Sequence, residues 1–154
     1  MRIRFVCVGK IREPWLRGGL AEYTKRISRF TDLDFVEVAA RPDSLPTEVA
    51  LAREGEDVLA KLRPDEFVVL SDCRAPEISS EELAAEMEKW IEAGKGGFTI
   101  VIGGSNGLSE DVRQRADVAV SLSRLTFTHE MTQLIWLEQL YRGFRIARGE
   151  TYHK

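Results

Sequence analysis

Two stretches of the sequence have the residue types and spacing of a small-ligand site. The first is a loop with three glycines, Gly103-Gly104-Ser105-Asn106-Gly107, which directly follows the apolar run 98–102. Open α/β sheets bind ligands past the carboxyl ends of their strands, and glycine lets the backbone approach a ligand closely. The second is the segment 123–128, where polar and apolar residues alternate without forming a regular element. We predict that the two loops together enclose a small polar cofactor.

Other catalytic signatures do not match this sequence. The glycine loop lacks the G-x-G-x-x-G pattern of dinucleotide-binding folds, and it follows the fourth expected strand rather than the first. Gly9-Lys10 lacks the remaining residues of a phosphate loop. The two cysteines and two histidines do not have the spacing of a zinc site, so we expect no metal ion.

The last residues of the chain are unusual for a terminus. They are Tyr152, His153 and Lys154, whose side chains can all transfer a proton or contact an anion. Because chain ends are usually disordered, a frayed tail is the alternative interpretation. His129 has two interpretations as well, since it can cap the last helix or border the cofactor site.

Strands and helices alternate along the chain, which favours a parallel α/β sheet flanked by helices in a single domain, 1–154. Apolar runs predict strands at 2–9, 33–38, 67–70, 98–102 and 118–122. Helical spacing predicts helices that begin near Pro14, Thr47, Ser80, Ser109 and His129. Gly55 leaves open whether the second helix is one piece or two. The last helix, 129–147, has a wide apolar face that predicts packing against a partner subunit as well as the sheet.

The composition is that of a soluble globular protein, with 44% hydrophobic and 31% charged residues in 154. No apolar run is long enough for a membrane span, and the N-terminus does not look like a signal peptide. Cys7 and Cys73 lie in or beside apolar runs, so we expect reduced core thiols in a cytoplasmic protein.

Charge is distributed unevenly along the chain. Residues 1–31 hold eight Lys or Arg against two Asp or Glu, residues 32–122 hold nine against twenty, and residues 123–154 hold five against three. If the two ends meet in space they form a basic face, which suits a nucleic-acid partner. Solvated helix surface is the alternative interpretation.

Several motifs occur together in an order and spacing that resemble one known family. They are Val6-x-Val8-Gly9, Ile102-Gly103-Gly104-x-x-Gly107-Leu108-Ser109, Ser121-Leu122-Ser123-x-Leu125-Thr126-Phe127-x-His129, Leu140-Tyr141-Arg142 and Tyr152-His153-Lys154. Over essentially its whole length the chain resembles the RlmH family of SPOUT-class (α/β-knot) methyltransferases. That family uses S-adenosylmethionine to methylate N3 of a pseudouridine in 23S ribosomal RNA of the large subunit.

The resemblance implies a C-terminal trefoil knot, a homodimer with its sites near the subunit interface, and action on the assembled ribosome without a separate RNA-binding domain. It implies that S-adenosylmethionine contacts the following residues: Leu70, Ser71, Asp72, Gly103, Gly104, Ser123, Arg124, Leu125, Thr126, Phe127 and Thr128. The sequence departs from the family pattern at Leu70-Ser71-Asp72-Cys73, where many members have a Leu-Asp pair in another register. It departs again at Gly149-Glu150-Thr151, where Asn-His-Pro is more usual.

The chemistry of the implied reaction suggests roles for individual residues. The imide N3–H must lose its proton, and His153 is a plausible general base because its pKa is close to the working pH. Tyr152 would stack on or hydrogen-bond the target base, and Lys154 would hold a phosphate. We expect the RNA phosphates to contact Arg4, Lys10, Arg12, Arg142 and Arg145. The rival interpretations are a non-catalytic RNA- or ribosome-binding module and an enzyme that uses another nucleotide-like cofactor.

Overall fold

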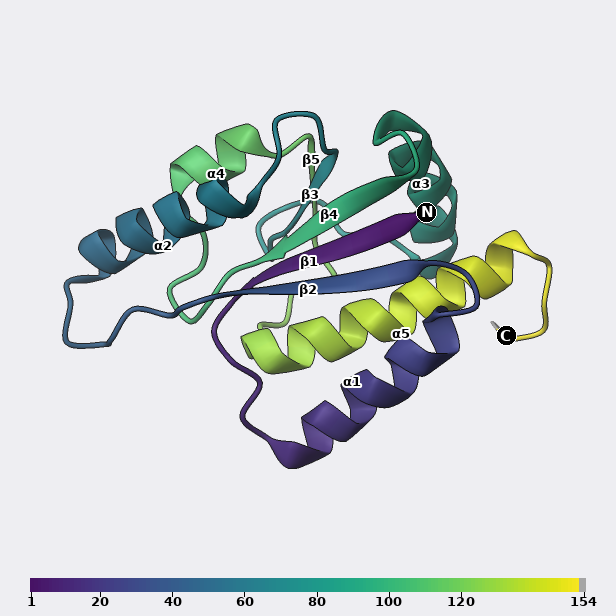
Figure 1. The fold of residues 1–154 in the computed structure, drawn as a ribbon, viewed down its shortest axis with the longest axis horizontal. Helices are drawn as coiled ribbons and strands as arrows, with labels where there is room; N and C mark the ends of the chain where they lie inside the picture. The colour runs from purple at the N-terminus through teal and green to yellow at the C-terminus, as the bar shows by residue number, and fades with distance from the viewer. Residues whose placement is uncertain (153–154) are drawn as a thin grey trace.

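The computed structural model describes residues 1–152 and contains one sheet of five parallel strands between two layers of helices (Figure 1). The strands lie in the order β2-β1-β4-β3-β5. Their bounds are β1 Arg2–Val8, β2 Asp32–Val38, β3 Val68–Ser71, β4 Gly97–Ile102 and β5 Val118–Val120. The helices are α1 Pro14–Ile27, α2 Thr47–Lys61, α3 Ser80–Ala93, α4 Glu110–Arg115 and α5 His129–Ala147. The predicted element order is therefore confirmed.

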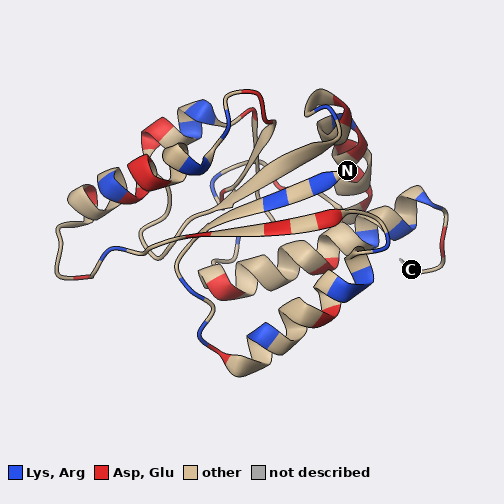
Figure 2. Ribbon diagram, in the orientation of Figure 1, with Lys and Arg blue, Asp and Glu red and all other residues tan. Residues whose placement is uncertain are grey.

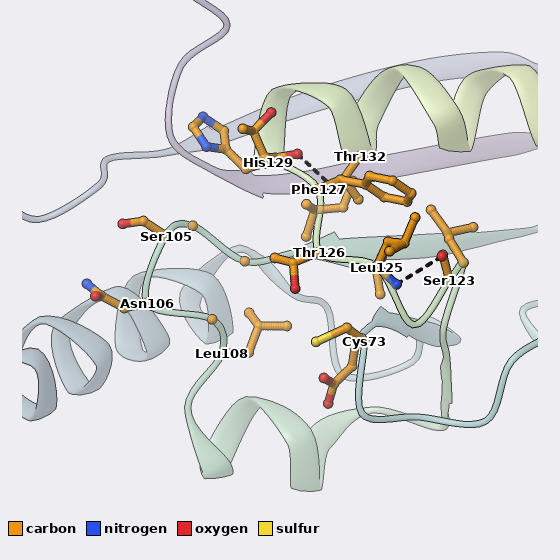
Figure 3. A pocket seen from close by; sticks show the side chains of 18 of the residues that line it. Cys73, Ser105, Asn106, Leu108, Ser123, Leu125, Thr126, Phe127, His129 and Thr132 are labelled. Atoms are coloured by element: carbon orange, nitrogen blue, oxygen red, sulfur yellow. Dashed lines mark hydrogen bonds between the residues drawn. The ribbon is translucent and has the colours of Figure 1, made fainter.

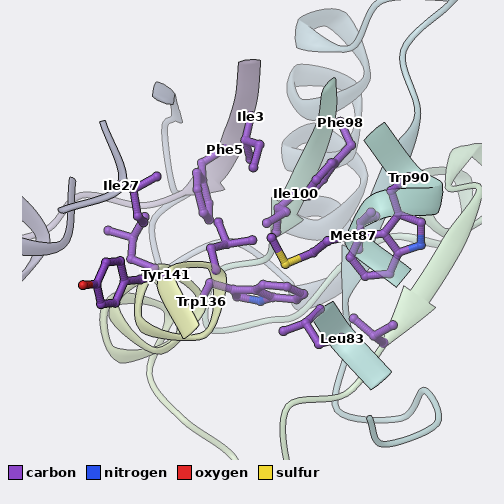
Figure 4. Close-up of a cluster of buried hydrophobic side chains, with 14 of the residues drawn as sticks. Ile3, Phe5, Ile27, Leu83, Met87, Trp90, Phe98, Ile100, Trp136 and Tyr141 are labelled. Atoms are coloured by element: carbon purple, nitrogen blue, oxygen red, sulfur yellow. The ribbon is translucent and has the colours of Figure 1, made fainter. Parts of the chain in front are cut away.

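The sheet is buried on both faces. Side chains alternate along β1, so Ile3 and Phe5 join a core cluster that includes residues of α1, α3 and α5, whereas Val6 and Val8 join a cluster with residues of α2 and α4. Figure 4 shows the first cluster, in which Trp136 of α5 is fully buried. Strands buried on both faces are the reason these segments read as nearly continuous apolar runs.

Side-chain caps fix where three of the helices begin. Ser79 and Glu82 form a capping box at the start of α3. The Ser109 hydroxyl accepts a hydrogen bond from the Val112 backbone amide at the start of α4, and Thr128 caps α5 in the same way. These caps hold two of the helices at the ends of the loops that the sequence singled out.

The second helix is one continuous element rather than two pieces. A Cβ atom at Gly55 would overlap the Ser109 hydroxyl, so this glycine allows α2 to approach the start of α4 closely. The glycine is therefore required by packing between helices and does not break the helix.

The two cysteines have different environments. Both are free, and Cys7 is buried in the core, where burial raises the pKa of its thiol. Cys73 is exposed, so the prediction of a core thiol is wrong at this position. Cys73 follows β3 by two residues and already belongs to the loop outside the sheet.

The basic segments at the two ends of the chain meet, because α1 packs against α5. Their carboxyl-terminal halves carry arginines that stack on aromatic rings, with Arg29 4.7 Å and Arg148 4.5 Å from the Phe30 ring centroid. Figure 2 shows this concentration of basic residues near the end of α5. The basic face thus lies at the opposite end of α5 from the loop that precedes His129.

Arg4 is an exception among the expected RNA contacts, because it is only 8% exposed. Its guanidinium contacts the Glu66 carboxylate at 2.6 Å and the Asp34 carboxylate at 3.3 Å. The same Glu66 oxygen accepts a 2.7 Å hydrogen bond from the Thr99 hydroxyl. Arg4 alternates with the apolar residues of β1 and points into the sheet, where an RNA phosphate has no access. The expected phosphate contact is therefore contradicted.

We predict that Arg4→Ala lowers the free energy of unfolding by about 3–5 kcal/mol, because it leaves the Glu66 carboxylate buried without its cation. Chemical denaturation monitored by circular dichroism measures this change. Arg2→Ala, at an exposed position of the same strand, is the control and should stay within about 0.5 kcal/mol of the parent. Equal stability of the two variants would show that the buried ion pair does not hold the strands together.

Candidate active site

A cavity of about 570 Å³ opens at the carboxyl edge of the sheet. Three segments form it: the end of β3 with the residues that follow, the glycine loop after β4, and the loop that leads into α5 (Figure 3). Its lining consists of Ser71, Asp72, Cys73, Ile102, Gly103, Gly104, Ser105, Asn106, Gly107, Leu108, Arg113, Leu122, Ser123, Leu125, Thr126, Phe127, Thr128, His129 and Thr132. The two loops predicted from the sequence therefore face one cavity.

The glycine loop is a tight turn that only small residues can form. The Gly107 amide donates a 3.0 Å hydrogen bond to the Gly104 carbonyl, and Gly107 has φ +83°, in the left-handed region. A Cβ atom at Gly103 would lie 2.6 Å from the Gly107 carbonyl oxygen. Because its glycines carry no side chains, the loop presents its backbone to the cavity.

The loop before α5 is held by its own serine and threonine side chains. The Ser121 hydroxyl donates to the Ser123 carbonyl at 2.8 Å, and the Leu125 amide donates to the Ser123 hydroxyl at 3.0 Å. The Thr128 hydroxyl accepts from the Met131 amide at 3.2 Å. Local bonds of this kind replace regular secondary structure and hold Leu125 and Thr126 at the cavity.

The end of β3 contributes two polar groups whose positions are fixed from behind. The Ser71 hydroxyl accepts a 2.8 Å hydrogen bond from the indole Nε1–H of buried Trp136. The Asp72 carboxylate forms an ion pair with Arg113 of α4. Burial lowers the pKa of the Arg113 guanidinium, and its Nε atom is enclosed without a hydrogen-bond partner. A charged pair therefore forms part of the cavity wall.

His129 borders the cavity at the first residue of α5, while Thr128 supplies the cap. The imidazole Nε2 lies 3.2 Å from the Lys10 carbonyl, and a Cβ atom at Gly9 would lie 2.7 Å from the same nitrogen. Of the two interpretations of His129, the structure supports the one that borders the site. The loop after β1 consequently lies against the edge of the cavity.

Glu130 holds that loop in place. Its carboxylate accepts hydrogen bonds from the backbone amides of Arg12 and Glu13, and the bond from Arg12 is the main reason that its pKa is lowered. Lys10 and Arg12 are both exposed. Two of the expected phosphate contacts are thus held next to the cavity on an anchored loop.

Most of the expected cofactor contacts line the cavity, and two do not. Those that do are Ser71, Asp72, Gly103, Gly104, Ser123, Leu125, Thr126, Phe127 and Thr128. Leu70 is buried in the second core cluster, because its side chain points into the sheet face covered by α2 and α4. Arg124 is 92% exposed and pairs with Glu77 at 3.3 Å, outside the lining.

Sequence reasoning placed Ser105, Asn106 and Gly107 in a predicted site loop, but it missed several other lining residues. They are Cys73, Ile102, Leu108, Arg113, Leu122 and Thr132. Thr132 lies three residues after His129, on the same face of α5, so helical spacing was a usable signal. Arg113 has no such signal, because its place depends on how α4 packs beside the end of β3.

Tyr152, the last described residue of the C-terminal tail, packs on α5 away from the cavity. Tyr152 packs edge-on against Tyr141 with ring centroids 4.9 Å apart, and its hydroxyl donates to Glu138 at 3.2 Å. At about 1.5 Å per residue, Tyr141 lies about 18 Å along α5 from His129. His153 and Lys154 lie outside the described residues. The catalytic residues expected in the tail therefore remain a prediction.

A family model described as "Predicted SPOUT methyltransferase" matches residues 1–153. The chain belongs to the SPOUT methyltransferase family. This α/β-knot enzyme is 44% identical to a protein of Acetivibrio thermocellus named "Ribosomal RNA large subunit methyltransferase H", over 100% of both chains. The resemblance inferred from the motifs is confirmed, and a methyltransferase is an enzyme rather than a binding module.

Solved structures support the fold of this SPOUT methyltransferase. A probable methyltransferase from Bordetella pertussis Tohama I has a TM-score of 0.54 at 20% identity, covering 92% of this chain and 93% of that chain. A tRNA (m1G37) methyltransferase from Aquifex aeolicus has a TM-score of 0.52 at 18% identity, covering 92% of this chain and 70% of that chain. At these identities the likeness concerns the fold alone.

No group of three or more His, Cys, Asp or Glu side chains among residues 1–152 is arranged to hold a metal ion. Among the same residues, no helix combines the length and apolar character that crossing a membrane requires.

We predict that one of the two thiols of the SPOUT methyltransferase reacts quickly with a thiol reagent such as DTNB in the native state. Cys73 is exposed at the cavity whereas Cys7 is buried. A ligand that fills the cavity should slow the reaction of Cys73, and Cys73→Ser should abolish it. Rapid modification that no cavity ligand slows would place the ligand elsewhere.

Proposed function

We propose that this SPOUT methyltransferase transfers the methyl group of S-adenosylmethionine to N3 of a pseudouridine in 23S ribosomal RNA, on the assembled ribosome in the cytoplasm. The observation that carries the proposal is the cavity formed by the two motif loops, in a chain that matches a named ribosomal RNA methyltransferase over its full length. We also infer that 1–154 is a single domain, since all five strands belong to one sheet.

The cavity fits a cofactor of this kind in size and chemistry. Its volume of about 570 Å³ falls within the range of about 300–1,000 Å³ that is usual for small-molecule sites. Ser71 and Asp72 offer fixed polar groups at one wall, and the glycine loop offers backbone amides and carbonyls at another. Leu108, Leu125 and Phe127 supply apolar surface between them. We infer that these residues hold S-adenosylmethionine.

When bound, the sulfonium group of the cofactor supplies a methyl carbon that is already activated for displacement. For the methyl group to be transferred to N3, a residue of this protein would have to take up the proton that N3 carries. The contribution of the protein is to align N3 with the methyl carbon and to accept or stabilise that charge. We assign proton removal to His153, in line with the sequence-based expectation.

The tail of one chain would act at the cavity of its partner. Tyr152 is docked beside Glu138, about 13 Å along α5 from His129. Tyr152 is therefore held far along α5 from the cavity of its own chain. A homodimer whose α5 helices run antiparallel would bring each tail to the cavity of the other subunit.

The charge distribution supports the same arrangement. The arginines at the end of α5, including Arg145 and Arg148, lie far from the cavity of their own chain, with Arg145 bonded to the Tyr141 hydroxyl at 2.8 Å. Antiparallel pairing would place this basic end beside the partner's cavity, where RNA phosphates must approach. Arg142 is bonded to Glu138 at 2.6 Å and would contact RNA from that position.

Tyr152 suits a hydrogen-bonding role rather than proton removal. Burial raises its pKa to about 12. A group with a raised folded pKa keeps its proton through neutral pH, and the stability it contributes as a neutral phenol is lost only as the pH rises through 12. The phenol is therefore a donor at working pH, and we leave the base to His153.

Calorimetric titration tests the cofactor assignment. We expect saturable binding of S-adenosylmethionine and S-adenosylhomocysteine, and no binding of NAD or ATP. Gly104→Val should abolish binding, because even a Cβ atom there would lie 3.0 Å from Val8, and Gly18→Val, in open space on α1, is the control. Binding of NAD or ATP instead would favour the rival with another nucleotide-like cofactor.

Mixed dimers test the exchange of tails. Each homodimer of Gly104→Val or of His153→Ala should be inactive on ribosomes that lack the modification. A mixture of the two, after subunit exchange, should recover about a quarter of parent activity, since half of the dimers carry one complete composite site. If each tail served its own cavity, the mixture would remain inactive.

A further inference from the structure

A second cavity of about 320 Å³ lies between α1 and the edge strand β2, with α5 behind it. Its lining consists of Cys7, Gly9, Ile11, Arg17, Leu20, Ala21, Thr24, Phe35, Val36, Glu37 and Gln133. We call it the β2 groove. None of these residues lines the first cavity, and the catalytic proposal makes no use of them.

Gln133 marks the β2 groove as more than a packing defect. It is only 4% exposed, yet its side-chain amide makes no hydrogen bond among residues 1–152. Neither polar atom of this amide is among the fully enclosed, unpartnered side-chain atoms of the described residues, so the amide is open to the groove and can meet a ligand there. Because Gln133 lines the groove, a ligand there can supply the donor and acceptor that the amide lacks.

The walls of the groove suit a flat ligand with a polar edge. Phe35 is 44% exposed and stacks on Phe5 on its inner side, so it has ring surface left for a second flat group. Glu37 is exposed, and it points to the same sheet face as Phe35 because side chains alternate along β2. The floor is the buried Cys7, whose raised thiol pKa keeps it uncharged.

Two exposed cations lie beside the groove, on the side of the first cavity. Lys10 and Arg12 are exposed on the loop after β1, next to Gly9 and Ile11 of the groove. The Arg17 guanidinium donates to the Ile11 carbonyl at 3.0 Å, and its side chain makes no other hydrogen bond among the described residues. Acidic residues lie along β2, whereas the basic residues lie on this loop (Figure 2). The anionic part of a ligand therefore belongs at the loop and its polar, uncharged part inside.

We propose that the β2 groove binds an unpaired nucleobase of the RNA substrate, next to the target nucleotide, and that it favours a base with an exocyclic amino group over uracil. An aromatic face for stacking and an amide for the base edge are the usual means of reading single-stranded RNA. Glu37 accepts a hydrogen bond from an exocyclic amino group, which uracil lacks. The loop with Lys10 and Arg12 holds the phosphate between the two bases.

The position of the groove fits a flanking nucleotide. Gln133 follows His129 by four residues on α5, about 6 Å along the helix. His129 lines the first cavity and contacts the Lys10 carbonyl, so this contact separates the two cavities. Two adjacent nucleotides of one RNA strand could therefore occupy the two cavities, one on each side of this contact. This inference rests on the proposed function, since it takes the substrate to be RNA.

The kinetic test uses the full chain and ribosomes that lack the modification. Gln133→Leu should raise the KM for ribosomes about tenfold, the loss expected for the hydrogen bonds of one base, with kcat and S-adenosylmethionine affinity unchanged. Because leucine replaces an unpartnered amide, the melting temperature should stay equal or rise. Gln114→Leu, at an exposed position of α4, is the matched control. An unchanged KM in Gln133→Leu overturns the inference.

A second readout does not depend on activity. The side-chain amide of Gln133 is followed by NMR during titration with CMP, AMP, UMP and ribose 5-phosphate. We expect saturable shifts with CMP and AMP, weaker ones with UMP, and none with the sugar phosphate. Glu37→Gln should remove the preference over UMP, and Glu56→Gln on α2 should not.

The two tests separate the possible failures. A parent enzyme that does not methylate ribosomes refutes the proposed function. The nucleotide titration then shows by itself whether the groove binds a nucleobase. A parent that methylates, with a Gln133 amide unmoved by every nucleotide, refutes the groove alone. Shifts confined to the β2 backbone when a peptide is added would identify a strand-pairing surface and also overturn it.

Discussion

The docking of α5 against the sheet is the constraint on which the rest of the structure depends. Trp136, Leu137 and Leu140 are fully buried between α1, α3 and the strands. Burial of side chains of this size contributes about 1.5–3 kcal/mol each. Trp136 also donates to Ser71 at 2.8 Å, so the same side chain that anchors the helix orients a group of the cavity. Core and site are therefore joined through one residue.

The position of α5 also determines which loops meet. Its first turn receives the segment 121–128 on one side and the loop after β1 on the other, through the Thr128 cap and the Glu130 carboxylate. The cavity lies on one side of this turn, and the β2 groove lies on the other. Both binding surfaces that we propose are thus built on the beginning of a single helix, whose far end carries the basic residues and Tyr152.

Charge in this protein has two separate uses. Arg4 and Glu66 are paired inside the molecule. Through this pair and the hydrogen bond from Thr99 to Glu66, β1 and β4 are joined to the segment that leads into β3. Lys10 and Arg12 are exposed, and the backbone around them is anchored by Glu130 rather than by their own side chains. A cation whose backbone is fixed while its side chain stays free is well suited to hold a phosphate. The net charge of −3 therefore says little about the partner.

The sequence by itself determined the order of the elements, the residues near which the helices begin, and the two loops of the site. Periodicity and capping are local, so they can be read without the fold. Only the tertiary structure decided that Arg4 is buried, that Leu70 and Arg124 lie off the cavity, and that Cys73 lies on it. The position of each of these residues depends on the face of the sheet toward which its side chain points and on the helix that packs against that face. The distance from Tyr152 to the cavity of its own chain was likewise decided by the length and direction of α5.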